Sequence, residues 1–311
     1  MKNKVFIIAG PTSSGKTSLA LQLTKEIHAE IISADSRQIY KYMDVGTGKI
    51  PVNSSNMKIS KEEGMWRIDE TNVWGYDLVE PGKYFSSYDF AKYSLEKIHN
   101  ITSQGKTTFI VGGTGFYIDT LTGRTTVSEK GVDTDLREEL SKLPLYTLQN
   151  KLKEINAEVF SKTDVNNPIR LIRAIERETS NTTSLTLPHL KNTEFVYLGL
   201  TAPREVLYQK VDNWVEEIWR GGVIEEVKKL IEMGYKDTPQ LHGLVYKSVL
   251  DYLSGEQKEA DAKQKIKFDL HAYIRRQQTW FKRNQEIKWL DITGENLSEN
   301  ALSIVKSYID G

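Results

Sequence analysis

Eight residues near the start of the chain have the types and the spacing of a phosphate-binding loop. They are Gly10, Pro11, Thr12, Ser13, Ser14, Gly15, Lys16 and Thr17. The backbone N–H groups of such a loop, together with the positive end of the helix that follows it, attract an anion. Lys16 can reach the outer phosphate oxygens, and the hydroxyl of Thr17 can hold Mg²⁺. The pattern therefore predicts a polyphosphate site, although it identifies neither the polyphosphate nor the bond that breaks.

A second polar group follows the next predicted strand. Residues 30–35 form an apolar-rich run that ends on Asp35, and Ser36, Arg37 and Gln38 follow it. Ligands of parallel α/β sheets bind at the carboxyl ends of the strands, so we expect Asp35 to lie near the phosphate loop. A carboxylate in this place could serve as a general base. The alternative is a helix cap or a turn, because Asp and Ser are common capping residues.

A third group consists of glycines at the end of a further predicted strand. Residues 107–111 form this buried strand and lead directly into Gly112, Gly113, Thr114 and Gly115. Proteins that hydrolyse nucleoside triphosphates usually place an aspartate for Mg²⁺ at the end of such a strand. The glycines found here instead argue against an ordinary NTPase.

The elements that must position these groups alternate along the chain. Strands are predicted at 5–9, 30–35, 107–111, 195–200 and 287–292, and segments with helical spacing separate them. This alternation predicts an α/β fold with a P-loop-type, mostly parallel sheet flanked by helices.

The sequence changes character between residues 123 and 191. Charged residues become dense there, the segments 135–142 and 146–155 have helical spacing, and no strand is predicted. We therefore predict a helical insertion domain at 123–191, within a P-loop core domain formed by residues 1–122 and 192–311.

Two basic segments could bind phosphates. Arg170, Arg173 and Arg177 are three and four residues apart, so they share one helix face. Residues 263–288 contain eight Lys or Arg and two acids, with aromatic residues among them. Contact with nucleic-acid phosphates is one interpretation. Solvated helix faces, with the aromatic residues packed inward, are the other.

Composition excludes several kinds of site. The chain has 311 residues, 42 Lys plus Arg, 42 Asp plus Glu and no Cys. Disulfides, thiolate metal ligands and a thiol nucleophile are therefore impossible. A formal net charge of zero argues against nucleic-acid binding through overall charge, but it allows a local basic face. We find neither a signal peptide nor an apolar run of ~18 residues, so we expect a soluble, cytoplasmic protein with no membrane partner.

From the residues alone, three kinds of protein stay open. A transferase that uses a phosphorylated donor explains both the phosphate loop and the carboxylate beside it, and we favour it. A small-molecule kinase that binds ATP would use the same loop. A non-catalytic, nucleotide-gated binding protein is the third, but the sequence has no recognisable switch loops.

Several strings, taken in order, resemble one family. They are residues 10–17, 32–40, 43–47, 111–117, 167–176 and 275–281. Together they are similar to the tRNA dimethylallyltransferases (tRNA isopentenyltransferases) over about residues 5–290. The Asp-Ser-Arg-Gln string at 35–38 and the Arg-Arg-Gln-Gln-Thr-Trp-Phe string at 275–281 are the most specific. The resemblance implies an enzyme that transfers a dimethylallyl group from dimethylallyl diphosphate to N6 of the adenosine 3′ to the anticodon in tRNA.

The resemblance also implies roles for single residues. The loop at 10–17 would bind the donor's diphosphate, with Mg²⁺ as cofactor at Thr17. Lys16, Thr17 and Asp35 would be catalytic, and Asp35 would accept the proton of the adenine amine. The residues that would contact the anticodon stem-loop of tRNA are Asp35, Ser36, Arg37, Gln38, Thr114, Arg137, Ile169, Arg170, Arg173, Arg276 and Gln277. We expect the chain to act as a monomer.

The chain departs from the family in the helix that follows residues 203–205. Relatives often carry arginine there, where this chain has Lys210 and Trp214. The residue that supplies a further cation to the diphosphate therefore differs in this chain.

Overall fold

A central sheet organises the part of the chain that the computed structural model describes, residues 3–50, 57–125, 133–179 and 192–310. Its strands are β1 (Asn3–Ala9), β2 (Ala29–Ser33), β3 (Ile59–Glu62), β4 (Met65–Ile68), β5 (Thr71–Trp74), β6 (Thr107–Gly112), β7 (Thr193–Thr201) and β8 (Lys288–Asp291). The order is β3-β4-β5-β2-β6-β1-β7-β8. Strands β5, β2, β6, β1, β7 and β8 are parallel to one another. Strand β4 is antiparallel to both of its neighbours, β3 and β5. The predicted α/β fold with a mostly parallel sheet is confirmed.

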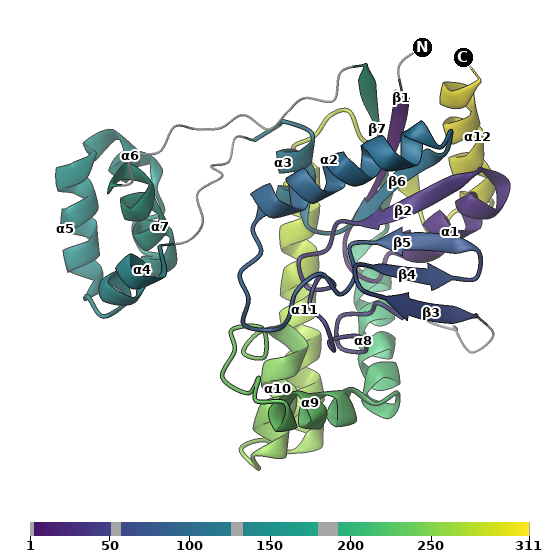
Figure 1. Ribbon diagram of the computed structural model, residues 1–311. Helices are drawn as coiled ribbons and strands as arrows, with labels where there is room; N and C mark the ends of the chain where they lie inside the picture. Colours follow the sequence, from purple (N-terminus) through teal and green to yellow (C-terminus); the bar gives the residue numbers. More distant parts are fainter. Residues whose placement is uncertain (1–2, 51–56, 126–132, 180–191, 311) are drawn as a thin grey trace. The chain divides into compact units, whose positions relative to one another are not determined.

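Helices cover both faces of the sheet, which explains why its central strands read as apolar runs. Phe6 and Ile8 of β1 share a core with α1 (Lys16–Glu26) and α12 (Leu297–Ile309). Side chains alternate along a strand, so Val5 and Ile7 point to the opposite face. There α2 (Ser87–Ser103) and α3 (Gly115–Leu121) lie (Figure 1). Burial of a side chain such as Phe6 stabilises the fold by about 1.5–3 kcal/mol.

Four further helices form a second core. They are α8 (Arg204–Arg220), α9 (Val223–Glu232), α10 (Leu244–Leu253) and α11 (Glu259–Phe281). Ile39, Tyr40 and Met43, which follow β2, are buried in this same core. The segment after β2 therefore links the sheet to these helices. No helix of the described residues is both long and apolar enough to cross a membrane.

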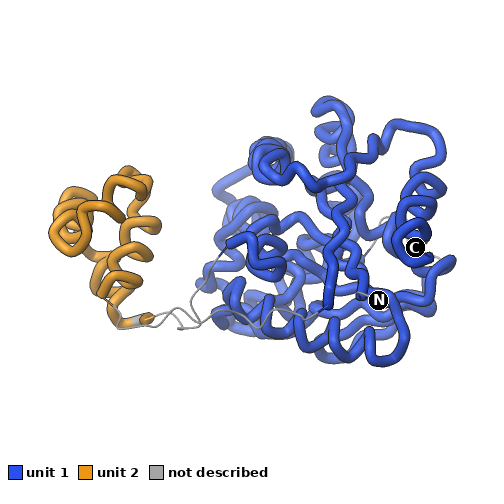
Figure 2. Tube along the Cα trace, turned by 90° about the horizontal axis from the view of Figure 1, so that it is seen from above, with its two compact units in different colours: residues 1–125, 188–311 blue, residues 126–187 orange. Residues whose placement is uncertain are grey.

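The chain divides into two units, coloured separately in Figure 2. One comprises residues 1–125 and 188–311, and the other residues 126–187. The helices described in the second unit are α4 (Thr134–Ser141), α5 (Leu145–Ile155), α6 (Ala157–Lys162) and α7 (Pro168–Thr179). Leucines of α4, α5 and α7, among them Leu140, Leu148 and Leu171, form its core. The helices predicted at 135–142 and 146–155 are correct to within one residue at each end.

Candidate active site

A cavity of about 530 Å³ lies where the sheet meets α8, α10 and α11. The phosphate loop, the residues that follow β2, residues 46–48 and the end of β6 at Gly112 and Gly113 also line it. The predicted site residues that line it are Thr12, Ser13, Gly15, Lys16, Thr17, Asp35, Arg37, Gln38 and Gln277. The structure thus brings the phosphate loop and Asp35 to one cavity, although they follow two different strands.

The loop after β1 turns back sharply on itself. A Cβ at Gly10 would lie 2.7 Å from the carbonyl oxygen of Leu200, so only glycine fits there. Ser13 and Gly15 have positive φ angles of 59° and 85°, and such strain at a non-glycine residue is typical of functional sites. The hydroxyl of Ser14 is buried and has no hydrogen-bond partner among the described residues. An unsatisfied hydroxyl inside a loop of turned backbone fits an anion site.

Lys16 supplies the cation of this loop. Its Nζ donates to the carbonyl oxygen of Pro11 at 2.7 Å. Part of the side chain faces the cavity, but protein surrounds the ammonium group. This desolvation lowers the pKa of Lys16 to about 8, and the negative charge of Asp35 partly opposes the shift. Lys16 is therefore charged at neutral pH and begins to lose its proton not far above it.

Asp35 lies in the corner that follows β2. Its Oδ1 accepts the backbone N–H of Arg37 at 2.9 Å, so the carboxylate stabilises its own turn while it lines the cavity. The N–H of Ser36 donates to the hydroxyl of Thr114 at 3.0 Å, which joins two strand ends. Ser36 and Thr114 lie beside the cavity and are not among its described lining residues. Both interpretations of Asp35, turn cap and cavity carboxylate, therefore apply.

Gln38 lines the cavity and is also bonded within the chain, and its contact with tRNA stays a prediction. The side chain is buried, and its Oε1 accepts the hydroxyl of Ser33 at 2.7 Å. Its Nε2 donates to the carbonyl oxygens of Thr47 and Gly48, at 3.2 Å each. Because both ends of the amide are bonded within the chain, Gln38 holds the segment 46–48 against the end of β2.

Gln277 of α11 is the second predicted tRNA contact that lies in the interior. It is 5% exposed. Its Oε1 accepts the N–H of Thr12 at 2.8 Å, and its Nε2 donates to the carbonyl oxygen of Gly113 at 2.9 Å. A Cβ at Gly113 would lie 2.3 Å from this Nε2, so the glycine makes room for the amide. Gln277 therefore ties α11 to the phosphate loop.

One stripe of α8 lines the cavity and was not among the predicted site residues. It consists of Lys210, Asn213, Trp214 and Glu217. Spacings of three, four and seven residues place them on one face of the helix. That spacing is the signal that could have identified Asn213 and Glu217. Lys210 adds a cation to those of the phosphate loop and Arg37.

Two tyrosines that the sequence did not single out for function also line the cavity. Burial and the nearby charge of Asp35 raise the pKa of Tyr273 to about 12. Burial and the neighbouring Glu226 carboxylate raise the pKa of Tyr246 well above its usual value. Both hydroxyls therefore stay protonated and can donate hydrogen bonds at neutral pH. Aromatic residues in a sequence more often signal packing, which is why these two were missed.

The basic segment at 263–288 is less basic than its sequence suggests. Lys263 and Lys267 donate to the two oxygens of Glu216 in α8, at 2.8 and 2.7 Å. These ammonium groups hold the pKa of Glu216 at about 2. Lys265 pairs with Asp269 at 2.6 Å. The first half of α11 is therefore largely neutralised.

The second half of α11 keeps exposed cations. Arg275 and Arg276 are exposed, and Arg275 donates to the hydroxyl of Tyr208 at 3.1 Å. The guanidinium of Arg276 lies 5.6 Å from the ring centre of Tyr273. Arg276 and Gln277 are adjacent, yet one faces solvent and the other the interior. Arg276 stays a predicted tRNA contact.

In the second unit, α7 presents three of the predicted tRNA residues. Ile169, Arg170 and Arg173 are exposed, and Ile169 is 63% exposed although it is apolar. Arg170 forms an exposed ion pair with Asp164 at 3.3 Å. Such a surface pair contributes little to stability, so it leaves Arg170 available to another anion.

Arg137 differs from these three because its partner within the unit is a buried carboxylate. Its Nε and Nη2 donate to the two oxygens of Glu176, at 3.1 Å or less. Glu176 is 8% exposed and also accepts the N–H of Asp133 at 2.8 Å. Arg137 therefore has a structural role that joins α4 to α7, and its contact with tRNA stays a prediction.

We expect Arg137→Ala to loosen this unit. The substitution removes the bidentate guanidinium contact of the Glu176 carboxylate, which costs about 2–3 kcal/mol. Hydrogen–deuterium exchange of the full chain should be at least tenfold faster in α4 and α7. Lys142→Ala is the control, because its pair with Glu138 is exposed and worth at most about 0.5 kcal/mol. Unchanged exchange in α7 would show that Arg137 does not hold the unit together.

Comparisons with known proteins agree with the geometry of the site. The family description "IPP transferase" matches residues 38–284, and "Isopentenyl transferase" matches residues 3–69. A curated tRNA dimethylallyltransferase of Acetivibrio thermocellus is 36% identical over 99% of this chain and 97% of its own length. One of Clostridioides difficile is 37% identical over 96% of this chain and 95% of its own length.

Solved structures show the same fold. The tRNA isopentenylpyrophosphate transferase of Bacillus halodurans has a TM-score of 0.69 and 29% identity, covering 100% of this chain and 96% of that one. A eukaryotic dimethylallyltransferase acting on tRNA has a TM-score of 0.76 over 99% of this chain and 80% of that one, at 24% identity, and supports the fold alone. None of these comparisons favours a kinase. From its matches over nearly its whole length, the chain belongs to the IPP transferase family, whose curated members are tRNA dimethylallyltransferases.

Proposed function

We propose that this protein transfers a dimethylallyl group from dimethylallyl diphosphate to N6 of the adenosine 3′ to the anticodon in tRNA. The observation that carries the proposal is the single cavity that joins the phosphate loop to Asp35. A diphosphate donor needs the phosphate loop, and an amine nucleophile needs a base such as Asp35. Membership of the family supplies the identity of both substrates.

In the proposed reaction the N6 amine attacks the first carbon of the dimethylallyl group. A C–N bond forms, the C–O bond to diphosphate breaks, and the diphosphate leaves with the bonding electrons. Lys16, Lys210 and the loop N–H groups would stabilise the charge that grows on the leaving group. Asp35 would accept the proton that the nitrogen releases. The adenine must leave its stack to reach this cavity.

The site also fits Mg²⁺, which we propose as cofactor. Thr17 lines the cavity and carries a hydroxyl, and Mg²⁺ prefers oxygen ligands, among them those of substrate phosphates. The described residues hold no cluster of three or more His, Asp or Glu side chains that could bind a metal by itself. A bound Mg²⁺ would neutralise charge on the diphosphate. Thr17 is the residue that would hold it.

We propose that exposed residues of each unit contact the anticodon arm. Arg276 of α11 and the α7 residues Ile169, Arg170 and Arg173 are exposed, as residues that contact RNA must be. We further propose that the protein acts as a monomer in the cytoplasm. Size-exclusion chromatography with light scattering tests the monomer.

One assay tests the function. The protein is mixed with Mg²⁺, unmodified tRNA and radiolabelled dimethylallyl diphosphate, and a parallel reaction contains ATP and tRNA. We expect label in the tRNA, on the adenosine next to the anticodon. ATP turnover without transfer of label would overturn the proposal and favour a kinase.

Donor affinity should depend on pH through Lys16. Diphosphate binds the charged ammonium, and the pKa of Lys16 is about 8 in the free protein. The Kd for dimethylallyl diphosphate should therefore rise above pH 8, by up to about tenfold per pH unit. Titration calorimetry from pH 6.5 to 9.5 measures this. In Lys16→Arg the cation does not titrate, so the same rise in this variant would exclude Lys16 as its source.

Arg276→Ala should weaken tRNA binding with little effect on the donor. Loss of one phosphate contact lowers the slope of log K against log salt by about 1. Filter binding at several salt concentrations measures the slope. Lys265→Ala is the matched control on the same helix, because its charge is already paired with Asp269. Equal slopes for Arg276→Ala and the unchanged protein would contradict a phosphate contact.

A further inference from the structure

The segment that follows β2 forms one wall of the cavity. Gly46, Thr47 and Gly48 line it, and Trp214 of α8 packs near Gly48, 3.6 Å from where a Cβ would be. Glycine-rich backbone has little side-chain packing to fix its position. The contacts that hold this segment therefore decide where the wall lies.

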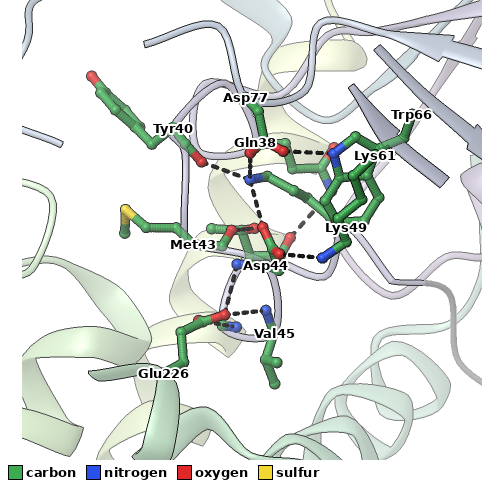
Figure 3. A network of polar contacts seen from close by, with 12 residues as sticks. Gln38, Tyr40, Met43, Asp44, Val45, Lys49, Lys61, Trp66, Asp77 and Glu226 are labelled. Atoms are coloured by element: carbon green, nitrogen blue, oxygen red, sulfur yellow. Dashed lines mark hydrogen bonds and ion pairs between the residues drawn. The ribbon is translucent and has the colours of Figure 1, made fainter. Parts of the chain in front are cut away.

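Glu226, in the first turn of α9, binds the backbone of this segment. Its carboxylate accepts three consecutive N–H groups, of Asp44 at 2.7 Å, Val45 at 2.6 Å and Gly46 at 3.0 Å (Figure 3). The hydroxyl of Tyr246 donates to the same carboxylate at 2.8 Å. Hydrogen bonds to a charged acceptor are roughly twice as strong as neutral ones. One side chain thus satisfies four donors around the wall.

Tyr246 connects this carboxylate to the cavity itself. A Cβ at Gly46 would lie 2.7 Å from the Tyr246 ring, so the ring packs directly on the glycine backbone. The ring also lines the cavity. Glu226 therefore fixes two neighbouring parts of the lining, one through backbone N–H groups and one through a hydroxyl.

A second set of contacts fixes the other end of the segment. Lys49 is fully buried, and its Nζ donates to the carbonyl oxygen of Tyr40 at 2.6 Å and to carboxylate oxygens of Asp44 and Asp77 at 2.9 and 2.5 Å (Figure 3). Asp77 also accepts the indole N–H of Trp66 at 2.6 Å. These bonds tie the segment to the sheet, whereas Glu226 ties it to the helices.

We infer that Glu226 is a positioning residue for the transfer reaction, which holds residues 44–46 and Tyr246 so that the wall at 46–48 faces the phosphate loop with fixed geometry. This inference rests on the proposed function. Glu226 is not among the described lining residues and contacts no reacting atom. Its effect is expected in the rate of reaction, because a shift of about 1 Å in a positioning element can lower a rate by as much as about 10²-fold.

The first test measures the hydrogen bonds directly. In Glu226→Gln the side chain keeps its volume, but an amide replaces the charge and one acceptor oxygen. We expect the amides of residues 44–46 to exchange with deuterium at least tenfold faster, while the other amides of α9 stay unchanged. Unchanged exchange at 44–46 would overturn the inference without any assay of activity.

The second test measures turnover. For Glu226→Gln we expect kcat to fall by about tenfold or more, with the KM for the donor within threefold of the unchanged protein. Glu226→Asp keeps the charge but is one methylene shorter, so it should recover part of kcat. Glu225→Gln, an exposed carboxylate on the same helical turn, is the control and should leave kcat unchanged.

A second variant changes the same wall directly, at Gly46 instead of at Glu226. Gly46→Ala brings a Cβ against the Tyr246 ring and should lower kcat with the same pattern, even if Glu226→Gln folds poorly. Faster exchange at 44–46 with an unchanged kcat would show that the wall does not position substrates. If the unchanged protein transfers no dimethylallyl group, the proposed function fails, whereas the exchange result still reports on Glu226 alone.

Discussion

Asp35→Asn is expected to lower kcat by about 10³-fold while the affinity for dimethylallyl diphosphate stays within threefold of the unchanged protein. The amide keeps an oxygen that can accept the N–H of Arg37, so the turn at Asp35 should persist. It cannot accept the proton that the adenine amine releases. The substitution therefore removes the base and leaves the phosphate loop in place.

The pH of this measurement matters because Asp35 raises the pKa of Lys16. Without the carboxylate, the pKa of Lys16 falls below about 8, so donor affinity should be compared at pH 6.5 to 7, where the ammonium is charged. Single-turnover transfer from labelled donor measures the chemical step, and calorimetry measures donor binding. A rate within tenfold of the unchanged protein would exclude Asp35 as the base. A loss of donor binding at pH 6.5 would instead show that Asp35 organises the phosphate loop.

The sequence predicted the phosphate loop and Asp35 because each depends on local structure. Strand, glycine loop and helix follow one another within 5–26, and the strand at 29–33 ends just before Asp35. In a parallel sheet the carboxyl ends of the strands lie along one edge, and only β6 separates β1 from β2. The order along the chain was therefore enough to bring these two groups together.

The rest of the site depends on pairings between distant segments. Lys263 and Lys267 belong to the basic segment at 263–288, which the sequence left as either a nucleic-acid contact or a solvated helix face. Glu216 of α8, 47 residues before Lys263, neutralises both lysines. Likewise Glu226 reaches the backbone of Asp44 across 182 residues. No periodicity in one segment reveals such partners, since they arise only when α8, α9 and α11 pack together.

The buried position of Gln277 could not be predicted from the sequence of α11 either. The resemblance to the family implied that both Arg276 and Gln277 contact tRNA. Successive residues of a helix point about 100° apart, so adjacent positions can face opposite surroundings. Which of them faces inward is decided by the packing of α11 against the loop at Thr12 and the corner at Gly113.

Gln277→Met is therefore expected to weaken donor binding by about 30-fold and to leave tRNA affinity unchanged. Methionine fills a similar volume but leaves the N–H of Thr12 and the carbonyl of Gly113 without their partner. Each unsatisfied buried group costs about 1–3 kcal/mol, and about 2 kcal/mol of lost donor binding corresponds to this factor. A residue that contacts tRNA, as the resemblance to the family implied, would show the opposite pattern.

Separate titrations with donor and with tRNA distinguish the two roles. Gln278→Met is the matched control, because this neighbouring amide accepts an exposed hydrogen bond from Arg204 instead of bonding to the phosphate loop. Arg276→Ala should give the opposite result, with weakened tRNA binding and unchanged donor binding. If Gln277→Met weakened tRNA binding and kept normal donor affinity, Gln277 would instead be a residue that contacts tRNA. The expected pattern would instead make α11 the element that joins the two substrates, since consecutive residues of one helix would serve the tRNA and the diphosphate.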